Sequence, residues 1–457
     1  MNIAAKDNAF RARSKKQSQL GWLGLSLTLL TAGCERPAVN SPTIPAKTAA
    51  TVSTNHPAIP LPDSTRLVLV PLGGESALDK QIALAQQQVR GGGNTGAALE
   101  KLGWLFVSKA RVSFDPGFHK LAEQCALSLE ELQPGAPEAL LLRGHVLQNL
   151  HRFQEAEPLA RQLVAQRGRA FDHGLLGDVL MEQGRLNEAI AAYQQMADLK
   201  PDLHAYTRAA HVRWLKGDLE GAVEMIQLAL SAASPRDAES AAWVYTRMAI
   251  YQLQAGQIEE SLQHSAAALE FQKDYPPALL VRGRCLLAGG KFEEAIEPLK
   301  QAAALNPLPE YQWTLAEALR AANRIGLAEA VEQQIKNHGA TADPRTFSLF
   351  LATRGENFTQ AIQLAEEELS ARQDVFTQDA LAWALAAAGR WSDAVVPMRL
   401  ALAEGTRDAR LFLHAGIIAS RTGDAAKAEH YFTGAHSLSQ TLLPSEQAQL
   451  EKYSPRS

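Results

Sequence analysis

Few residues of this chain have the types and spacing that catalysis or metal binding requires. The segment Gly283–Lys291 has the glycines and the lysine of a phosphate-binding loop, but their spacing is wrong and Phe292 stands where Ser or Thr would be needed. No His-Glu-x-x-His, Gly-x-Ser-x-Gly or Cys-x-x-Cys arrangement occurs. His430 and His436 are six residues apart, so they would not share a helix face as a metal pair. We therefore expect no catalytic residues, no metal site and no cofactor.

One cysteine ends a segment that has the features of an export signal in their usual order. Residues 1–19 are basic and polar, and residues 20–30 form an uncharged, mostly apolar run of eleven. A helix needs about 20 residues to cross a bilayer, so this run is typical of a signal peptide. The run is followed by Thr31-Ala32-Gly33-Cys34, which resembles the lipobox of bacterial lipoproteins.

The lipobox resemblance implies that residues 1–33 are removed and that Cys34 is lipidated. In that family the cysteine receives a diacylglycerol through its sulfur and an acyl group on its new amino group, and two or more chains anchor a protein stably. Thr31 departs from the preferred Leu, while Glu35, in place of Asp, favours the outer membrane. We expect a lipid-anchored protein of the bacterial cell envelope, on the periplasmic side. A secreted or periplasmic protein with an ordinary signal peptide is the alternative.

Residues 34–75 are expected to tether the body of the protein to the membrane. They combine seven prolines with many Ser, Thr and Ala residues. Proline donates no backbone hydrogen bond and small polar side chains bury little surface, so the composition predicts a disordered segment. We expect the apolar stretch Leu67–Val70 to dock on the folded part as a strand-like piece.

The rest of the chain repeats one pattern about ten times. A small residue recurs at intervals of 33 or 34 residues, with one interval of 39, at Ala122, Ala156, Ala189, Ala222, Ser261, Ala295, Ala328, Ala361, Ala394 and Ala428. A second small residue lies twelve places earlier in most units, and a glycine lies five places earlier in most. Glycine accepts the left-handed conformation that ends a helix, so each unit is predicted to be helix, tight turn, helix.

This unit resembles the 34-residue tetratricopeptide repeat. The unit Ala170–Asp202 shows the likeness best, through Leu176, Gly177, Ala189, Tyr193 and Pro201. The unit Ala342–Asp374 is weaker, because its glycine is displaced by one place. The resemblance covers roughly residues 90–440 and implies an all-α fold, a right-handed α-solenoid of about ten repeats.

The predicted domain organisation follows from these segments. The solenoid should span residues 76–438, with a hinge at 231–241, where the interval is 39 residues, and residues 439–457 should form a polar capping segment. Cys125 and Cys285 fall about five repeats apart, which is too far for a disulfide, so both are expected to be core thiols.

Charge and the resemblance together select candidate binding residues. Without residues 1–33 the chain has a net charge of −8, which argues against nucleic acid as a partner. The resemblance implies a concave groove lined by the first helix of each repeat. That places in the groove Arg208, His211, Trp214, Arg247, Arg284, Trp313, Glu317, Arg320 and Trp383. Arg side chains there can bind a carboxylate or an acidic segment. Alternatively the Arg side chains are solvated and the Trp side chains pack between repeats.

We expect a non-enzymatic, lipid-anchored scaffold that binds protein or peptide segments and supports an envelope complex. Two alternatives stay open: a structural organiser that associates with itself through solenoid ends or edges, and an enzyme or glycan-binding auxiliary of export machinery. Neither the partner nor the oligomeric state follows from the repeats, because one scaffold geometry can carry many binding surfaces.

Overall fold

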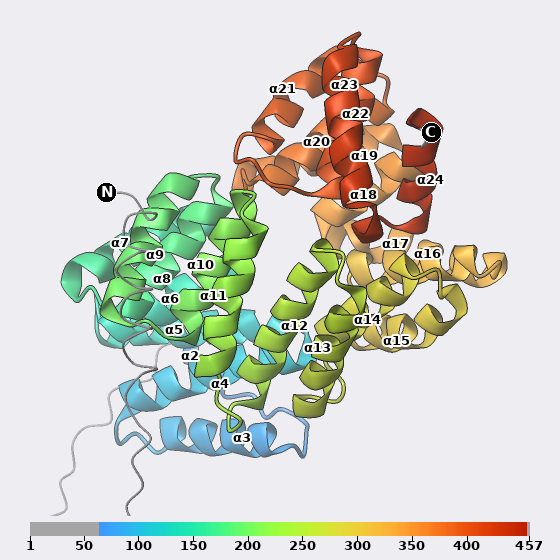
Figure 1. Ribbon diagram of the computed structural model, residues 1–457. Helices are drawn as coiled ribbons and strands as arrows, with labels where there is room; N and C mark the ends of the chain where they lie inside the picture. The colour runs from blue at the N-terminus through green and yellow to red at the C-terminus, as the bar shows by residue number, and fades with distance from the viewer. Residues whose placement is uncertain (1–63, 455–457) are drawn as a thin grey trace, which may run out of the picture. The chain divides into compact units, whose positions relative to one another are not determined.

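The computed structural model describes residues 64–454, which are almost entirely helical (Figure 1). In this range the chain forms twenty-three α-helices, α2 to α24, and one 3-10 helix, η1, and no strand. The all-α fold is therefore confirmed. The predicted signal peptide, the lipidated Cys34 and the tether up to residue 63 lie outside the described residues, so they stay predictions.

Twenty of the helices form ten pairs, numbered here 1 to 10 in chain order, and the two helices of each pair pack against each other. The first helices of pairs 1 to 10 are α4 (Thr95–Ser113), α6 (Pro137–Asn149), α8 (Ala170–Glu182), α10 (Leu203–Leu215), α12 (Ala238–Gln254), α14 (Pro276–Ala288), α16 (Pro309–Ala321), α18 (Pro344–Arg354), α20 (Val375–Ala387) and α22 (Ala409–Arg421). The second helices are α5 (Gly117–Leu132), α7 (Phe153–Gln166), α9 (Leu186–Leu199), α11 (Leu219–Ala232), α13 (Ile258–Phe271), α15 (Phe292–Leu305), α17 (Ile325–Ala342), α19 (Phe358–Ala371), α21 (Trp391–Ala401) and α23 (Ala425–Ser437).

The small residues of the sequence pattern lie where the two helices of a pair approach each other. A Cβ atom on Gly177 of α8 would lie 2.4 Å from the Tyr193 ring of α9, and one on Gly283 of α14 would lie 2.4 Å from the Leu299 side chain of α15. Ala189 is fully buried. Close packing at these contacts explains why the repeated pattern specifies the helix pairs.

The segments that flank the ten pairs differ from the prediction. Within the predicted tether, residues 64–68 form the helix α2 (Ser64–Val68), which packs on α5 and buries Val68 completely. The helix α3 (Ala77–Arg90) follows, and the Gln86 amide of α3 donates a hydrogen bond of 2.7 Å to the Val68 carbonyl. The expected disorder is thus corrected for residues 64–68, and the strand-like piece is corrected as well: Val68 docks at the end of a helix, and residues 69–75 form no regular secondary structure.

The other end of the chain folds back over the solenoid. The 3-10 helix η1 (Ser439–Thr441) contacts α12 and α14, and α24 (Pro444–Tyr453) packs against α16, α22 and α23. In α24, Glu446 is 1% exposed and accepts a hydrogen bond of 2.5 Å from Arg410. The predicted hinge region contains a loop at residues 233–237, between α11 and α12, whose bending stays a prediction.

The solenoid also contacts itself over a long sequence distance, as Figure 1 shows where the orange loops meet the green helices. The Gln373 N–H donates to the Glu182 carbonyl at 2.9 Å, and the Thr406 hydroxyl donates to the Leu215 carbonyl at 2.7 Å. The Gln440 amide donates to the Gln254 carbonyl at 3.0 Å. We call this set of contacts the seam. It joins the turns of pairs 3, 4 and 5 to the loops before pairs 9 and 10 and to the segment after pair 10.

Candidate binding site on the inner face

The first helices line the inner, concave side of the solenoid. First helices of successive pairs contact one another along much of the chain, as α4 contacts α6 and α18 contacts α20. Cavities of about 420, 290 and 190 Å³ lie between them. His211 lines the 420 and 290 Å³ cavities, and Phe376 lines the 420 and 190 Å³ cavities, so the three cavities are neighbours.

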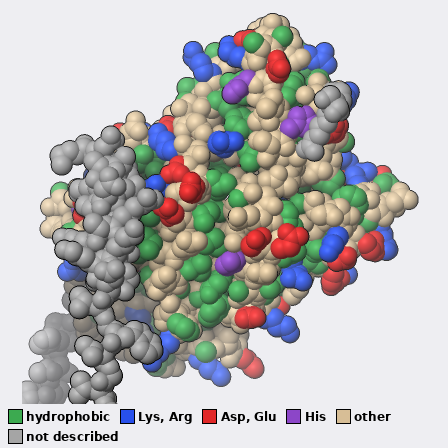
Figure 2. Space-filling view, in the orientation of Figure 1, with side chains coloured by type: hydrophobic (Ala, Val, Ile, Leu, Met, Phe, Trp, Pro, Cys, Tyr) green, Lys and Arg blue, Asp and Glu red, His purple; other side chains and the backbone are tan. Residues whose placement is uncertain are grey.

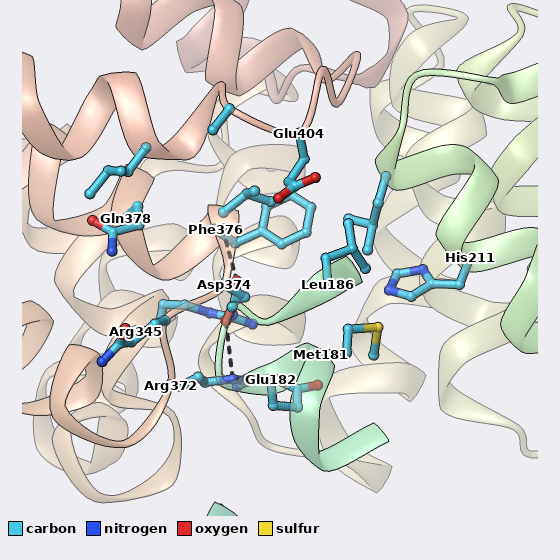
Figure 3. A pocket seen from close by; sticks show the side chains of 16 residues that line it. Met181, Glu182, Leu186, His211, Arg345, Arg372, Asp374, Phe376, Gln378 and Glu404 are labelled. Atoms are coloured by element: carbon cyan, nitrogen blue, oxygen red, sulfur yellow. Dashed lines mark hydrogen bonds and ion pairs between the residues drawn. The ribbon is translucent and has the colours of Figure 1, made fainter. Parts of the chain in front are cut away.

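The 420 Å³ cavity lies at the seam, between α8 and α10 on one side and the α19–α20 loop on the other (Figure 3). The Arg372 guanidinium donates to the Glu182 carboxylate, with Nε at 2.7 Å, and Arg345 pairs with Asp374 at 3.2 Å. Burial raises the pKa of Glu182, although Arg372 acts against this. Burial also acts to raise the pKa of Asp374, but the guanidinium groups of Arg345 and Arg372 hold that pKa below its usual range.

The 290 Å³ cavity contains an arginine whose neighbours are neutral. The Arg247 Nη2 donates to Nδ1 of His211 at 3.2 Å and to the Tyr251 hydroxyl at 2.9 Å, and its guanidinium lies 5.1 Å from the centre of the Tyr251 ring. Burial, and then the charge of Arg247, lower the pKa of His211 to about 3, so this histidine is a neutral acceptor at pH 7. Among the described residues no carboxylate pairs with Arg247.

A second arginine of this cavity is neutralised within the chain. Arg208 forms two hydrogen bonds with the Asp178 carboxylate, from Nε at 2.7 Å and from Nη2 at 2.6 Å. Although burial acts in the opposite direction, this carboxylate raises the pKa of Arg208. Trp243 lies at the same cavity with 37% of its surface exposed. The cavity therefore offers one uncompensated cation beside an exposed aromatic ring.

The structure brings three of the predicted residues together and places the others elsewhere. Arg208, His211 and Arg247 line the 290 Å³ cavity, and Trp214 lies next to it, with its ring stacked on Phe376 at 5.7 Å. The neighbouring 190 Å³ cavity is lined by Arg284 and Trp313, among others.

The remaining predicted residues are held by contacts within the chain. Trp313 is 2% exposed and donates a hydrogen bond of 3.2 Å to Glu317. Trp383 is 4% exposed and stacks on His414 with 4.1 Å between ring centres. Trp383 thus packs between two repeats, which is the alternative given by the sequence. Arg320 forms two hydrogen bonds of 2.7 Å with Glu332, and no cavity described above includes it.

Three residues of the cavities were not singled out from the sequence, although they too lie on first helices. Trp243 and Phe376 each lie six places before the first small residue of their repeat, as Arg208 lies two places before its own. Asp178 directly follows Gly177. Inner-face position alone is therefore a usable signal, but it does not distinguish residues paired within the chain from residues available to a ligand.

Charge is divided sharply between the two helices of each pair. The ten first helices carry fourteen Lys and Arg against nine Asp and Glu, which is a net charge of +5. The ten second helices carry six against twenty-two, a net charge of −16. Figure 2 shows acidic and basic side chains together along the outside of the arm that α15 to α17 form. The first helices thus carry a net positive charge within a mildly acidic protein.

Family comparisons agree with the helical-repeat architecture. Models of the tetratricopeptide repeat match residues 141–204, 175–238 and 252–319. Residues 141–238 and 252–319 are therefore tetratricopeptide repeats. No curated protein matches it significantly. Proteins of this family are in general non-enzymatic scaffolds that bind other proteins.

Solved structures with similar architecture come from bacteria and from humans. A tetratricopeptide-repeat protein of Thermus thermophilus is 20% identical, with a TM-score of 0.37, over 42% of this chain and 99% of its own. The human IFIT1 dimer with m7Gppp-AAAA is 15% identical, with a TM-score of 0.47, over 72% and 76%. PilF of Pseudomonas aeruginosa is 13% identical, with a TM-score of 0.38, over 47% and 96%. At these identities the likeness concerns the fold alone.

Other features associated with ligands give no further site. In residues 64–454 no three His, Cys, Asp or Glu side chains cluster as a metal site would require, and no helix there is long and apolar enough to cross a membrane. Cys125 and Cys285 are free thiols, 0% and 1% exposed. The segment Gly91–Gly96 has the Gly-x-Gly-x-x-Gly spacing of dinucleotide-binding turns, but it follows the helix α3, whereas that motif follows a strand.

Proposed function

We propose that this protein is a non-enzymatic scaffold of the bacterial cell envelope, anchored through a lipidated Cys34, whose inner face binds an acidic segment of a partner protein. The observation that carries the proposal is Arg247, a cation that lines a cavity between net-cationic first helices and has no carboxylate partner among the described residues. The first helices carry a net charge of +5, and Arg247 on α12 has neutral hydrogen-bond partners. An arginine without a carboxylate partner gains more binding free energy from a ligand carboxylate than an arginine that is already paired.

The chemistry at Arg247 defines what the partner must supply. A carboxylate can accept charge-assisted hydrogen bonds from the guanidinium, each worth about 1.5 to 3 kcal/mol when water is displaced. The 290 Å³ volume suits one Asp or Glu side chain of a bound segment. The exposed face of Trp243 is available to an apolar side chain next to it. Arg208 is expected to shape the cavity, because Asp178 already neutralises it.

The binding proposal is tested with a defined probe and a matched control variant. The probe is a Glu-rich peptide, compared with the same peptide carrying Gln, and binding to the full chain is measured by calorimetry. Arg247→Glu should weaken binding of the Glu peptide by about tenfold or more, since it replaces an attraction with a repulsion. Arg390→Glu, at an exposed position on another surface, should leave binding unchanged. Equal affinity for both peptides, or equal loss in both variants, would contradict the proposal.

The envelope location rests on the lipobox resemblance and has its own test. Cys34→Ala should move the protein from the membrane fraction to the soluble fraction, because the acyl chains supply the anchoring free energy. The measurement is membrane pelleting in high salt, which removes proteins held by charge alone. Pelleting of the variant like the wild type would reject the lipid anchor, and secretion of both would favour the alternative of an ordinary signal peptide.

A further inference from the structure

The seam is an interface between two different edges of the same solenoid. One edge, the turn edge, consists of the turns between the first and second helices of each pair. The other, the loop edge, consists of the loops between pairs. In pairs 3, 4 and 5 the last residue of the first helix is Glu182, Leu215 or Gln254, and each of these carbonyls accepts a hydrogen bond across the seam. These carbonyls have no partner within their own helix, so the loop edge satisfies a helix end.

Backbone and apolar contacts make the seam a fitted interface. A Cβ atom on Gly184 would lie 2.5 Å from the Gln373 carbonyl oxygen, and one on Gly217 would lie 2.6 Å from that of Gly405. Phe376, the second residue of α20, contributes its ring from the loop edge and stacks on Trp214. On the turn edge Leu186, the first residue of α9, is 5% exposed beside the same loop.

The turn edge of pairs 6 to 10 has the same features without a partner. The equivalent carbonyls accept no hydrogen bond from any described residue; they belong to Ala288, Ala321, Arg354, Ala387 and Arg421. Ile325 and Phe358 occupy the position of Leu186 in pairs 7 and 8 and are 41% and 36% exposed. Leu327 is 57% exposed at a position where five other second helices carry Asp or Glu.

The loop edge of the early pairs is also uncovered. Phe171 is the second residue of α8, as Phe376 is of α20, and it is 38% exposed in the described part of the chain. Leu199, which ends α9 at the next loop, is 55% exposed. Each end of the solenoid thus presents one of the two edges that meet in the seam, and each carries exposed apolar side chains at that edge.

We propose that the uncovered turn edge of pairs 7 and 8 binds the uncovered loop edge of a second copy of this chain, so that copies stack head to tail. The exposed apolar side chains select which parts of the two edges meet. The seam's offset of six pairs does not carry over between copies, because α3 packs on α4 and α24 packs on α22 and α23. The exposed side chains place the turns of pairs 7 and 8 on the loops before pairs 3 and 4.

This placement brings the exposed apolar residues of the two edges together. Leu327 and Ile325 meet Phe171 of the next copy, and Phe358 meets Leu199 of the next copy. Such an interface is heterologous, since each copy contributes a different surface, and it leaves one free edge at each end of the stack. The stacking uses the two edges and leaves the inner face, with Arg247, available for the ligand proposed above.

The test uses two substitutions at exposed positions and their mixture. Leu327→Glu places a charge on the turn edge, and Leu199→Glu places a charge on the loop edge. Val396→Glu, at a site 54% exposed on α21, is the control. The full chain with Cys34→Ala is followed by sedimentation velocity at micromolar concentrations. The wild type and the control should form dimers and larger species, and each edge variant alone should associate about tenfold or more weakly, because a charge is buried against an apolar surface.

The mixture distinguishes head-to-tail stacking from any symmetric dimer. Each edge variant keeps the edge that the other has lost, so an equal mixture should form dimers and nothing larger. A wild type that stays monomeric, edge variants that associate like the control, or a mixture that forms no dimers would each overturn the proposal. None of these outcomes depends on peptide binding, so the two proposals fail independently.

Discussion

The turns of pairs 3 to 5 and the turns of pairs 6 to 10 have nearly the same local structure but different surroundings. Gly184 and Gly290 occupy equivalent turns with φ of +73° and +70°. Around Gly184 the Gln373 backbone lies so close that no Cβ atom would fit, whereas no atom lies within 4 Å of the Cβ position at Gly290. The repeat pattern therefore determines the turn, and the path of the whole solenoid determines whether the turn becomes part of an interface.

This difference changes how stability is shared along the chain. In an open solenoid each repeat contacts its neighbours, so the free energy of unfolding is close to a sum over repeats and their nearest-neighbour interfaces. The seam adds contacts between residues about 190 places apart in sequence, such as Arg372 and Glu182. Pairs 3 to 5 are thus expected to unfold together with pairs 8 to 10, while variants in the uncovered turns should affect their own pair.

The largest expected effect is at the ion pair of the seam. Arg372 is 14% exposed, contacts Glu182 and Asp374, and lies with its guanidinium 5.8 Å from the centre of the Phe153 ring. Arg372→Ala leaves the Glu182 carboxylate without its cation and Asp374 with Arg345 alone, so the free energy of unfolding should fall by about 3 to 5 kcal/mol. Arg390→Ala breaks a pair with Asp393 that is half exposed, and should cost about 1 kcal/mol or less. The measurement is urea unfolding of both variants.

Equal losses in the two arginine variants would mean that the seam adds little stability. The same experiment reports on cooperativity. If the seam couples the two halves, Arg372→Ala should also broaden the transition or split it in two, which Arg390→Ala should not do.

A smaller effect is expected where a glycine permits close approach. Ala at Gly184 or at Gly290 has to adopt a left-handed backbone, and each substitution should cost about 1 kcal/mol. Gly184→Ala also forces its Cβ against the Gln373 carbonyl oxygen, so a further loss of about 1 to 3 kcal/mol is expected. Thermal unfolding compares the two, and hydrogen exchange at the Gln373 amide reports whether the seam has opened. Identical melting temperatures would contradict a fitted contact.

The sequence predicted the local structure of this protein better than its long-range contacts. Small residues such as Gly177 and Ala189 recur at a fixed interval because the helices of a pair approach there, so the ten pairs could be counted before the structure was known. Three inner-face residues, Arg208, His211 and Arg247, likewise follow from their places in the repeat. Within a repeating unit, position and neighbours are linked by sequence spacing alone.

The seam and the flanking helices could not be predicted in this way. Gln373 and Glu182 meet because the solenoid returns onto itself, and no periodic pattern marks the residues that meet. Trp383 was predicted to line an open groove for a different reason: its place in the repeat does not show that His414 of the next pair stacks on it. The helix α2 was overlooked because a proline-rich composition describes the average of the segment, whereas Val68 docks through a few apolar residues.

The smallest expected effect is on how the free energy of unfolding depends on pH. Burial lowers the pKa of His145 to about 4 and that of His211 to about 3, so both stay neutral in the folded protein where the unfolded chain, with a pKa of about 6.5, takes up protons. Their contribution to stability is therefore fully present above pH 6.5 and is lost as the pH falls toward 4, by at most about 1.4 kcal/mol per pH unit for each histidine.

The substitution His211→Gln isolates this contribution, since Gln keeps an acceptor for Arg247 but cannot take up a proton in this range. Its free energy of unfolding should fall less steeply than that of the wild type between pH 7 and pH 5. His430→Gln, at an exposed position on α23, is the matched control substitution. Urea unfolding at several pH values measures both slopes. Parallel curves for His211→Gln and the wild type would show that protons reach His211 in the folded state, and hence that the inner face beside Arg247 is better hydrated than its contacts indicate.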